Sequence, residues 1–119
     1  MDDELVGYTY SQTGDYSPDR IDVVLLRDVE VAKGSLLYVR HPKNGSPVVY
    51  QVTEVYSRKR VRGYEEALLR DGGFIDDEED TTVHASAYQW GWMDDEGRLR
   101  PLRHHLKPST PVYRASREV

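Results

Sequence analysis

The sequence contains no cysteine. A chain without thiols has no disulfide framework, no CxxC zinc site and no cysteine nucleophile, so several enzyme classes are excluded. It also has no apolar run long enough to span a membrane, and no basic and apolar amino terminus typical of a signal peptide. We therefore expect a cytoplasmic protein without membrane contact and, at 119 residues, a single domain over 1–119.

Charge is abundant and is separated along the chain. The formal net charge is −5. Residues 1–30 and 71–97 are rich in acids, whereas 98–117 is basic and contains no acid. Such blocks are either solvated polar faces or complementary surfaces between identical copies. The overall acidity argues against strong nucleic-acid binding by this chain alone.

A hairpin is the clearest structural signal. Ser35–His41 and Pro47–Tyr56 are rich in β-branched and aromatic residues, and they flank the turn-forming loop 42–46. Gly34 precedes the first arm, where a positive φ would let the chain bend into the strand. Further apolar or alternating runs predict strands at 5–10, 20–26, 81–93, 98–103 and 112–114.

These short strands in one small domain predict a mainly β protein, and we expect a small closed antiparallel β-barrel of about six strands. The segment 62–80 is interpreted as an insertion. Within it, the helical spacing of apolar residues over 63–73 predicts one short helix. The acidic run 76–80 lacks the glycine and the alternating spacing of a calcium loop, so no metal or other cofactor is expected.

Two strands contain irregularities. The apolar alternation of 47–56 slips at Thr53-Glu54, which indicates either a β-bulge or a strand that ends near Thr53. In 81–93 one face carries small residues and the other carries Tyr88, Trp90 and Trp92. We expect the aromatic face to fill the interior or to cover an interface, and packing in the core is the more frequent role of such a face.

Several segments also carry a family resemblance: Val6-Gly7 at the first strand, the glycine step into a strand over 29–39, Val49–Tyr56, Ala85-Ser86-Ala87 with Gly91, and the proline-punctuated exit 97–113. Together they resemble the amino-terminal HAS barrel, named after HerA and ATP synthase, of HerA-like archaeal and bacterial DNA translocases. The resemblance spans nearly the whole chain and consists of structural patterns.

The resemblance implies a non-catalytic barrel in a ring-shaped homo-oligomer, a hexamer in the full-length protein. Such a barrel would help subunits associate and would present a surface to a partner nuclease of the NurA type in DNA end processing and repair, meeting DNA only indirectly. The chain has no GxxxxGK[ST] phosphate loop, so it lacks the means of P-loop ATP hydrolysis. The resemblance places the ATPase domain downstream of Val119. Head-to-tail contacts in the ring would join an acidic block to a basic one.

The chain departs from this family at two places. The family's exit often reads Pro-Gly-Ser, whereas Ser109 follows Pro108 here, so a differently shaped final turn is expected. The insertion 62–80 has no residue-by-residue counterpart.

The candidate interface residues come from the basic run, the acidic run, the carboxy-terminal arginines and the aromatic face: Arg58, Lys59, Arg60, Arg62, Asp76, Asp77, Arg98, Arg100, Arg103, Tyr88, Trp90 and Trp92. Two alternatives stay open. A stand-alone OB-like or SH3-like module would bind single-stranded nucleic acid through the basic run 58–62 and the aromatic residues Tyr38, Tyr50 and Trp90. An enzyme would need a metal or acid–base site made of His41, His84, His104 and His105 with Asp94 or Asp95, but no HxxxH or HExxH spacing supports one.

Overall fold

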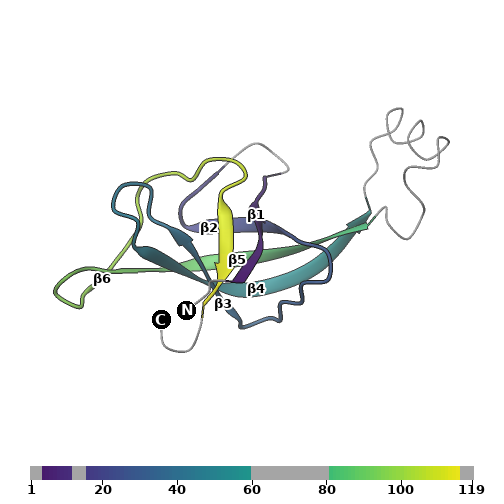
Figure 1. Cartoon of the computed structure of the whole chain (residues 1–119), viewed down its shortest axis with the longest axis horizontal. Helices are drawn as coiled ribbons and strands as arrows, with labels where there is room; N and C mark the ends of the chain where they lie inside the picture. Colours follow the sequence, from purple (N-terminus) through teal and green to yellow (C-terminus); the bar gives the residue numbers. More distant parts are fainter. Residues whose placement is uncertain (1–3, 12–15, 60–80, 116–119) are drawn as a thin grey trace.

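The structure is a computed structural model that describes residues 4–11, 16–59 and 81–115. These ranges contain seven strands and no helix: β1 (Glu4–Thr9), β2 (Arg20–Leu25), β3 (Leu36–Arg40), β4 (Pro47–Lys59), β5 (Thr81–Met93), β6 (Leu99–Arg100) and β7 (Pro111–Arg114) (Figure 1). Every predicted strand is present, although β6 is shorter than predicted. The helix predicted at 63–73 lies outside the described residues.

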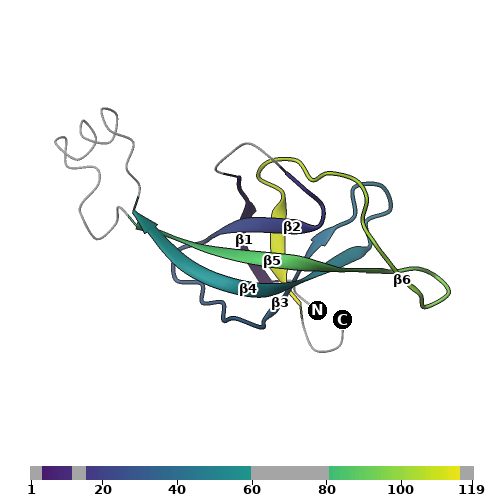
Figure 2. The same ribbon diagram turned by 180° about the vertical axis from the view of Figure 1, so that it is seen from behind.

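Six of the strands close into a barrel. Their order is β2-β1-β7-β3-β4-β5, and the pairing of β2 with β5 completes the circle. All pairings are antiparallel, so the predicted closed antiparallel barrel is confirmed. β6 is an additional strand that pairs with β5. β7 lies between β1 and β3 (Figures 1 and 2), so the last strand of the chain is part of the barrel wall.

The interior is filled by residues that alternate along the strands. Ala85 and Ala87 are fully buried, so the small face of β5 is the inner one. Small side chains there let the opposite walls of a narrow barrel approach each other. Leu102 and Leu106 join the core from the segment between β6 and β7. The other core residues are Val6, Ile21, Val23, Leu25, Val31, Leu37, Val39, Val48, Tyr50, Val52 and Val112.

The predicted hairpin is β3 and β4. Their register runs from Leu36 opposite Gln51 to Arg40 opposite Pro47. Gly34 has a φ of 93°, and its N–H donates to the carbonyl of Val52 at 2.8 Å. The bend into the first arm is therefore where the sequence predicts it.

The phase slip in the second arm is a β-bulge. Val52 pairs with Ala87 and Glu54 pairs with Ser86, which leaves Thr53 as the extra residue. β4 continues without interruption to Lys59. The bulge interpretation is confirmed, and a strand end near Thr53 is wrong. A bulge at this point increases the local bend, and small barrels need such bends to close.

A second bulge lies in β5, and the sequence pattern did not reveal it. Tyr50 pairs with Gln89 and Val49 pairs with Gly91, which leaves Trp90 as the extra residue. One extra residue reverses the inside–outside alternation of every side chain beyond it. Before the bulge, odd-numbered residues of β5 such as Ala87 face the interior. After the bulge, even-numbered residues such as Trp92 do so.

The turn before β7 contains Ser109, for which the sequence predicts a turn of unusual shape. Ser109 has a φ of 59°, the left-handed conformation that glycine adopts without steric cost. Thr9 in β1 holds this turn, because its hydroxyl donates to the carbonyl of Lys107 at 3.0 Å and accepts the N–H of Thr110 at 2.9 Å. Serine thus occupies a backbone conformation in which glycine is favoured.

Candidate interaction surface

The aromatic face of β5 is divided between two environments. Tyr88 and Trp90 are about half exposed, at 51% and 52%. Trp92 lies beyond the bulge, pairs with the buried Val48, and packs partly against the core. The prediction that the aromatic face packs in the core is therefore wrong for Tyr88 and Trp90, and it is correct in part for Trp92.

Two further apolar residues continue the exposed surface. Met93 and Leu99 are opposite each other in the β5–β6 pair, and they are 60% and 56% exposed. Leu99 Cγ lies 3.3 Å from the position that a Cβ on Gly91 would occupy, so it covers the backbone next to Trp90. We call the row Tyr88, Trp90, Met93 and Leu99 the β5–β6 stripe. Large apolar side chains gathered on a small surface mark interaction sites more often than isolated ones do.

Gly91 brings β6 close enough to form this surface. It has a φ of 123°, and a Cβ at this residue would lie 2.5 Å from the carbonyl oxygen of Arg100. Only glycine fits both the backbone conformation and this approach of another strand.

The rings of the stripe are held by polar neighbours. The indole N–H of Trp90 donates to Gln51 Oε1 at 3.2 Å. The guanidinium of Arg20 lies over the Tyr88 ring, 5.9 Å from its centroid. Arg20 in turn is fixed by an ion pair with Asp22 at 3.5 Å and a hydrogen bond to Ser86 Oγ at 3.3 Å. These contacts favour one orientation of the exposed rings before any partner binds.

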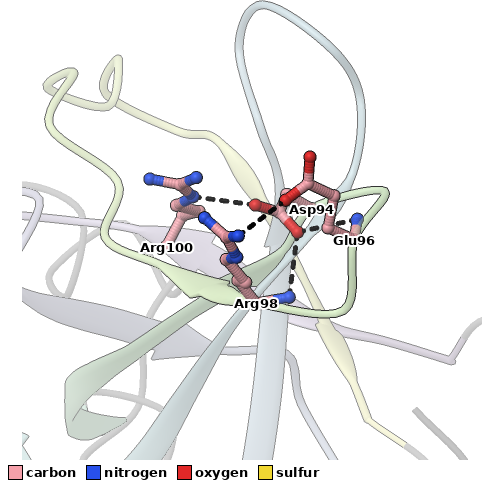
Figure 3. Close-up of polar contacts among 4 residues, drawn as sticks. All are labelled: Asp94, Glu96, Arg98 and Arg100. Atoms are coloured by element: carbon pink, nitrogen blue, oxygen red, sulfur yellow. Dashed lines mark hydrogen bonds and ion pairs between the residues drawn. The ribbon is translucent and has the colours of Figure 1, made fainter.

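The ends of the acidic and basic blocks pair with each other inside one chain. At the β5–β6 hairpin, Arg100 Nε lies 2.8 Å from Asp94 Oδ2, and Arg98 lies 3.1 Å from Glu96 (Figure 3). Asp94 also accepts the backbone N–H groups of Glu96 and Arg98, each at 2.9 Å. The hydrogen bond from Arg100, followed by that from the Arg98 backbone, holds the pKa of Asp94 below its ordinary value.

A similar intramolecular pair joins the neighbouring strands β1 and β7, where Arg114 Nε donates to Glu4 Oε1 at 2.9 Å. Arg103 is exposed and makes no ion pair within the part of the chain that the structure describes. Of the predicted carboxy-terminal arginines, Arg98 and Arg100 therefore have acidic partners in their own hairpin, and Arg103 does not.

Two other predicted interface residues lie away from the stripe, opposite the first residues of β5. Arg58 and Lys59 belong to the end of β4. Arg60, Arg62, Asp76 and Asp77 fall outside the described residues.

Two aromatic residues of the nucleic-acid alternative are inside the protein. Tyr50 is fully buried and Tyr38 is 3% exposed. The Tyr50 hydroxyl donates to the carbonyl of Pro18 at 2.7 Å, and burial raises its pKa above the ordinary value. Tyr38 stacks on Tyr113 with ring centroids 5.3 Å apart. The prediction that Tyr38 and Tyr50 stack on bases is therefore wrong, whereas Trp90 is accessible.

The histidines of the enzyme alternative lie at separate places on the barrel, with His84 apart from His41 and His104. Within the described ranges, no group of three or more His, Cys, Asp or Glu side chains could hold a metal ion. His84 is buried between Tyr10 and Tyr56, each with a ring centroid 5.4 Å away. His41 and His104 do meet, with ring centroids 5.6 Å apart.

A second apolar surface lies at the other end of β5. An open hollow of about 510 Å³ is lined mainly by the aliphatic residues Leu25, Val29, Val31, Val55 and Val83, with Ala32, Ser35 and the charged residues Glu30 and Arg114 completing its wall. Val55 and Val83 are 37% and 41% exposed. We call this the mouth hollow. Val83 is five residues along β5 from Tyr88, the nearest residue of the stripe, which corresponds to about 16 Å in an extended strand, and ten residues from Met93, about 33 Å. The stripe and the hollow are therefore two distinct surfaces.

No protein-family model matches the chain, and no curated protein matches it either. The function is therefore argued from the surfaces of the barrel, because a fold alone does not define one. Among the described residues there is no helix with the length and apolar character required to cross a membrane.

Proposed function

We propose that the chain is a non-catalytic assembly barrel, the amino-terminal barrel of a HerA-like hexameric DNA translocase of the cytoplasm, with its ATPase domain downstream. In this role it associates neighbouring subunits and docks a partner nuclease in DNA end processing. The observation that carries the proposal is the β5–β6 stripe, a row of four half-exposed apolar side chains on a closed barrel. The resemblance to HAS barrels is the reason for proposing a hexameric ring rather than another kind of assembly.

The placement of two apolar surfaces supports a head-to-tail arrangement. In Figures 1 and 2 the β5–β6 hairpin and the far ends of β4 and β5 lie at opposite ends of the long axis. A ring made of identical subunits needs two different patches on each copy, one contacting the other on its neighbour. The projecting stripe of one copy and the mouth hollow of the next form such a pair.

The ion pairs within the β5–β6 hairpin change the expected driving force. Arg98 and Arg100 already have acidic partners in their own chain, so burial of apolar surface contributes more to assembly than attraction between the charge blocks. Assembly should therefore persist at high salt, because salt screens charge contacts and leaves apolar contacts intact.

A complementation experiment tests the arrangement. Trp90→Glu places a charge in the stripe, and Val83→Glu places one at the mouth hollow. We expect each variant alone to remain monomeric in sedimentation velocity, because one of the two patches is lost. An equimolar mixture should form a heterodimer, since each variant keeps the patch that the other lacks. Lys43→Glu, an exposed change in the β3–β4 turn, is the matched control and should assemble like the wild type.

Three results would contradict the proposal. The wild-type chain remaining monomeric at every concentration would refute self-assembly. Full assembly of Trp90→Glu would exclude the stripe. Assembly lost at high salt and abolished by reversal of Arg98, Arg100 and Arg103 would assign the contact to the charge blocks instead.

A stand-alone module that binds single-stranded nucleic acid is the second candidate function. One observation favours it: Trp90 and Tyr88 are exposed next to each other in β5, with the guanidinium of Arg20 over the Tyr88 ring. Proteins that bind single-stranded nucleic acid stack its bases on exposed aromatic rings that lie beside cationic side chains. Titration with an oligonucleotide at two salt concentrations tests it. Steep and salt-sensitive quenching of tryptophan fluorescence supports binding, and no quenching refutes it.

A further inference from the structure

His41 lies at a junction of three parts of the chain that are distant in sequence. It follows β3 directly, and its ring is in edge contact with Trp92 of β5, with centroids 5.1 Å apart. The ring of His104, in the segment between β6 and β7, lies 5.6 Å away. His41 is only 7% exposed. One imidazole therefore connects the β3–β4 turn, β5 and the segment 101–105.

The ring also closes the β3–β4 turn. His41 Nδ1 accepts the backbone N–H of Lys43 at 3.0 Å and that of Asn44 at 3.4 Å. Its backbone takes part as well, because the N–H donates to the carbonyl of Ser46 at 2.8 Å and the carbonyl accepts the N–H of Gly45 at 2.9 Å. Nδ1 acts as an acceptor only while it carries no proton, so these two ring contacts require the neutral imidazole.

The surroundings offer little to stabilise an imidazolium. The turn contributes Lys43 and the neighbouring Arg40, and the segment 101–105 contributes Arg103, His104 and His105.

β5 contributes Trp92, which is uncharged, and further along it Asp94, which is engaged by Arg100 of β6. Burial, followed by the charge of His104, lowers the pKa of His41 from its ordinary value. The closed junction therefore binds a proton on His41 less readily than an open one does.

We propose that His41 is an acid-sensitive latch that holds the β3–β4 turn against Trp92 and the segment 101–105, and that protonation of its ring opens this junction. Opening removes both backbone N–H contacts of Nδ1 and separates His41 from His104. Met93, the next residue after Trp92, belongs to the stripe, so the latch lies beside the proposed interaction surface. The proposal does not depend on what that surface binds.

The direction of the pH dependence follows from the lowered pKa. Above about pH 6.5, the ordinary histidine value, neither state takes up a proton and the latch is closed. As the pH falls below 6.5, the open state takes up a proton first. The ratio of closed to open junction then decreases by up to about tenfold per pH unit, until the pH reaches the lower pKa of the closed state.

Nuclear magnetic resonance of the intact chain between pH 8 and pH 4.5 tests the latch. The readouts are the titration of the His41 ring proton and the hydrogen-exchange protection of the Lys43 amide, corrected for intrinsic exchange. We expect His41 to titrate below 6.5 and the Lys43 protection to decrease by up to about tenfold per pH unit over the same range.

Two variants isolate the imidazole. His41→Asn keeps a side-chain oxygen that accepts the N–H two residues on but does not titrate, so its Lys43 protection should not depend on pH. His104→Gln removes the neighbouring charge and should raise the midpoint toward 6.5 while keeping the transition.

The proposal would be overturned if the hydrogen-exchange protection of the Lys43 amide in His41→Asn decreased with falling pH as it does in the wild type. It would also be overturned by a His41 that titrates at 6.5 or above, a readout that needs no variant and stands even if His41→Asn does not fold.

Discussion

The close approach of β6 to Gly91 leads to a quantitative prediction. Gly91→Ala places a methyl group 2.5 Å from the carbonyl oxygen of Arg100, whereas real Cβ contacts essentially never fall below 3.0 Å. β6 must therefore move away by at least about 0.5 Å. Overpacking of this kind costs about 1–3 kcal/mol, and a non-glycine residue with an unfavourable φ costs about 1–3 kcal/mol as well. We expect Gly91→Ala to lower the free energy of unfolding by the sum of the two costs, about 2–6 kcal/mol.

Gly97→Ala is the matched control. Gly97 also has a positive φ, 78°, but no atom lies within 4 Å of the position of its Cβ. Only the backbone strain of the left-handed region remains there, so a loss of about 1–2 kcal/mol is expected. Urea unfolding followed by tryptophan fluorescence gives both free energies. Hydrogen exchange of the Leu99 amide shows whether β6 stays paired with β5. Equal losses in the two variants, or a β6 that stays paired in Gly91→Ala, would refute the argument from close approach.

Three further predictions follow from single contacts. Ser109→Gly should stabilise the protein by about 0.5–1 kcal/mol in thermal or urea unfolding, because glycine tolerates the left-handed turn; a loss of stability would contradict this reading of the turn. Tyr50→Phe should cost about 1 kcal/mol in the same assay, since Gln89 Nε2 still donates to the Pro18 carbonyl at 2.7 Å; no loss would mean that the buried hydroxyl contributes nothing. The lowered pKa of Asp94 means that its stabilising contribution is present above about pH 3.8 and is lost as the pH falls through the lower folded value. The difference in unfolding free energy between wild type and Asp94→Asn should therefore shrink in acid, and a constant difference would exclude the charge of Asp94 as its cause.

Much of the architecture could be predicted because it is local. The hairpin of β3 and β4 needs only alternating apolar residues and a turn, and its bend at Gly34 needs only a residue that tolerates positive φ. The bulge at Thr53 was visible because the apolar alternation slips there. In each case the signal lies within a few neighbouring residues.

The candidate surface was predicted only in part. The sequence points to Tyr88 and Trp90, but it also places Trp92 on their face because the alternation of 81–93 continues without a slip. The bulge at Trp90 is set by the pairing of β5 with β4, a relation between two strands. Met93 and Leu99 were missed for the same reason, because the register of the β5–β6 hairpin makes them neighbours.

By itself the sequence determined the strand pattern, the hairpin and the absence of thiol and P-loop chemistry, because each of these depends on residue types at short spacing. Only the tertiary structure decided that Tyr50 is internal and Trp90 external, and that Arg100 pairs with an acid of its own hairpin. It also decided that β7 lies in the barrel wall between β1 and β3, and that the ring of His41 meets that of His104. The physical reason is shared: burial, ion pairing and strand order depend on which distant segments lie side by side, and that is settled only when the barrel closes.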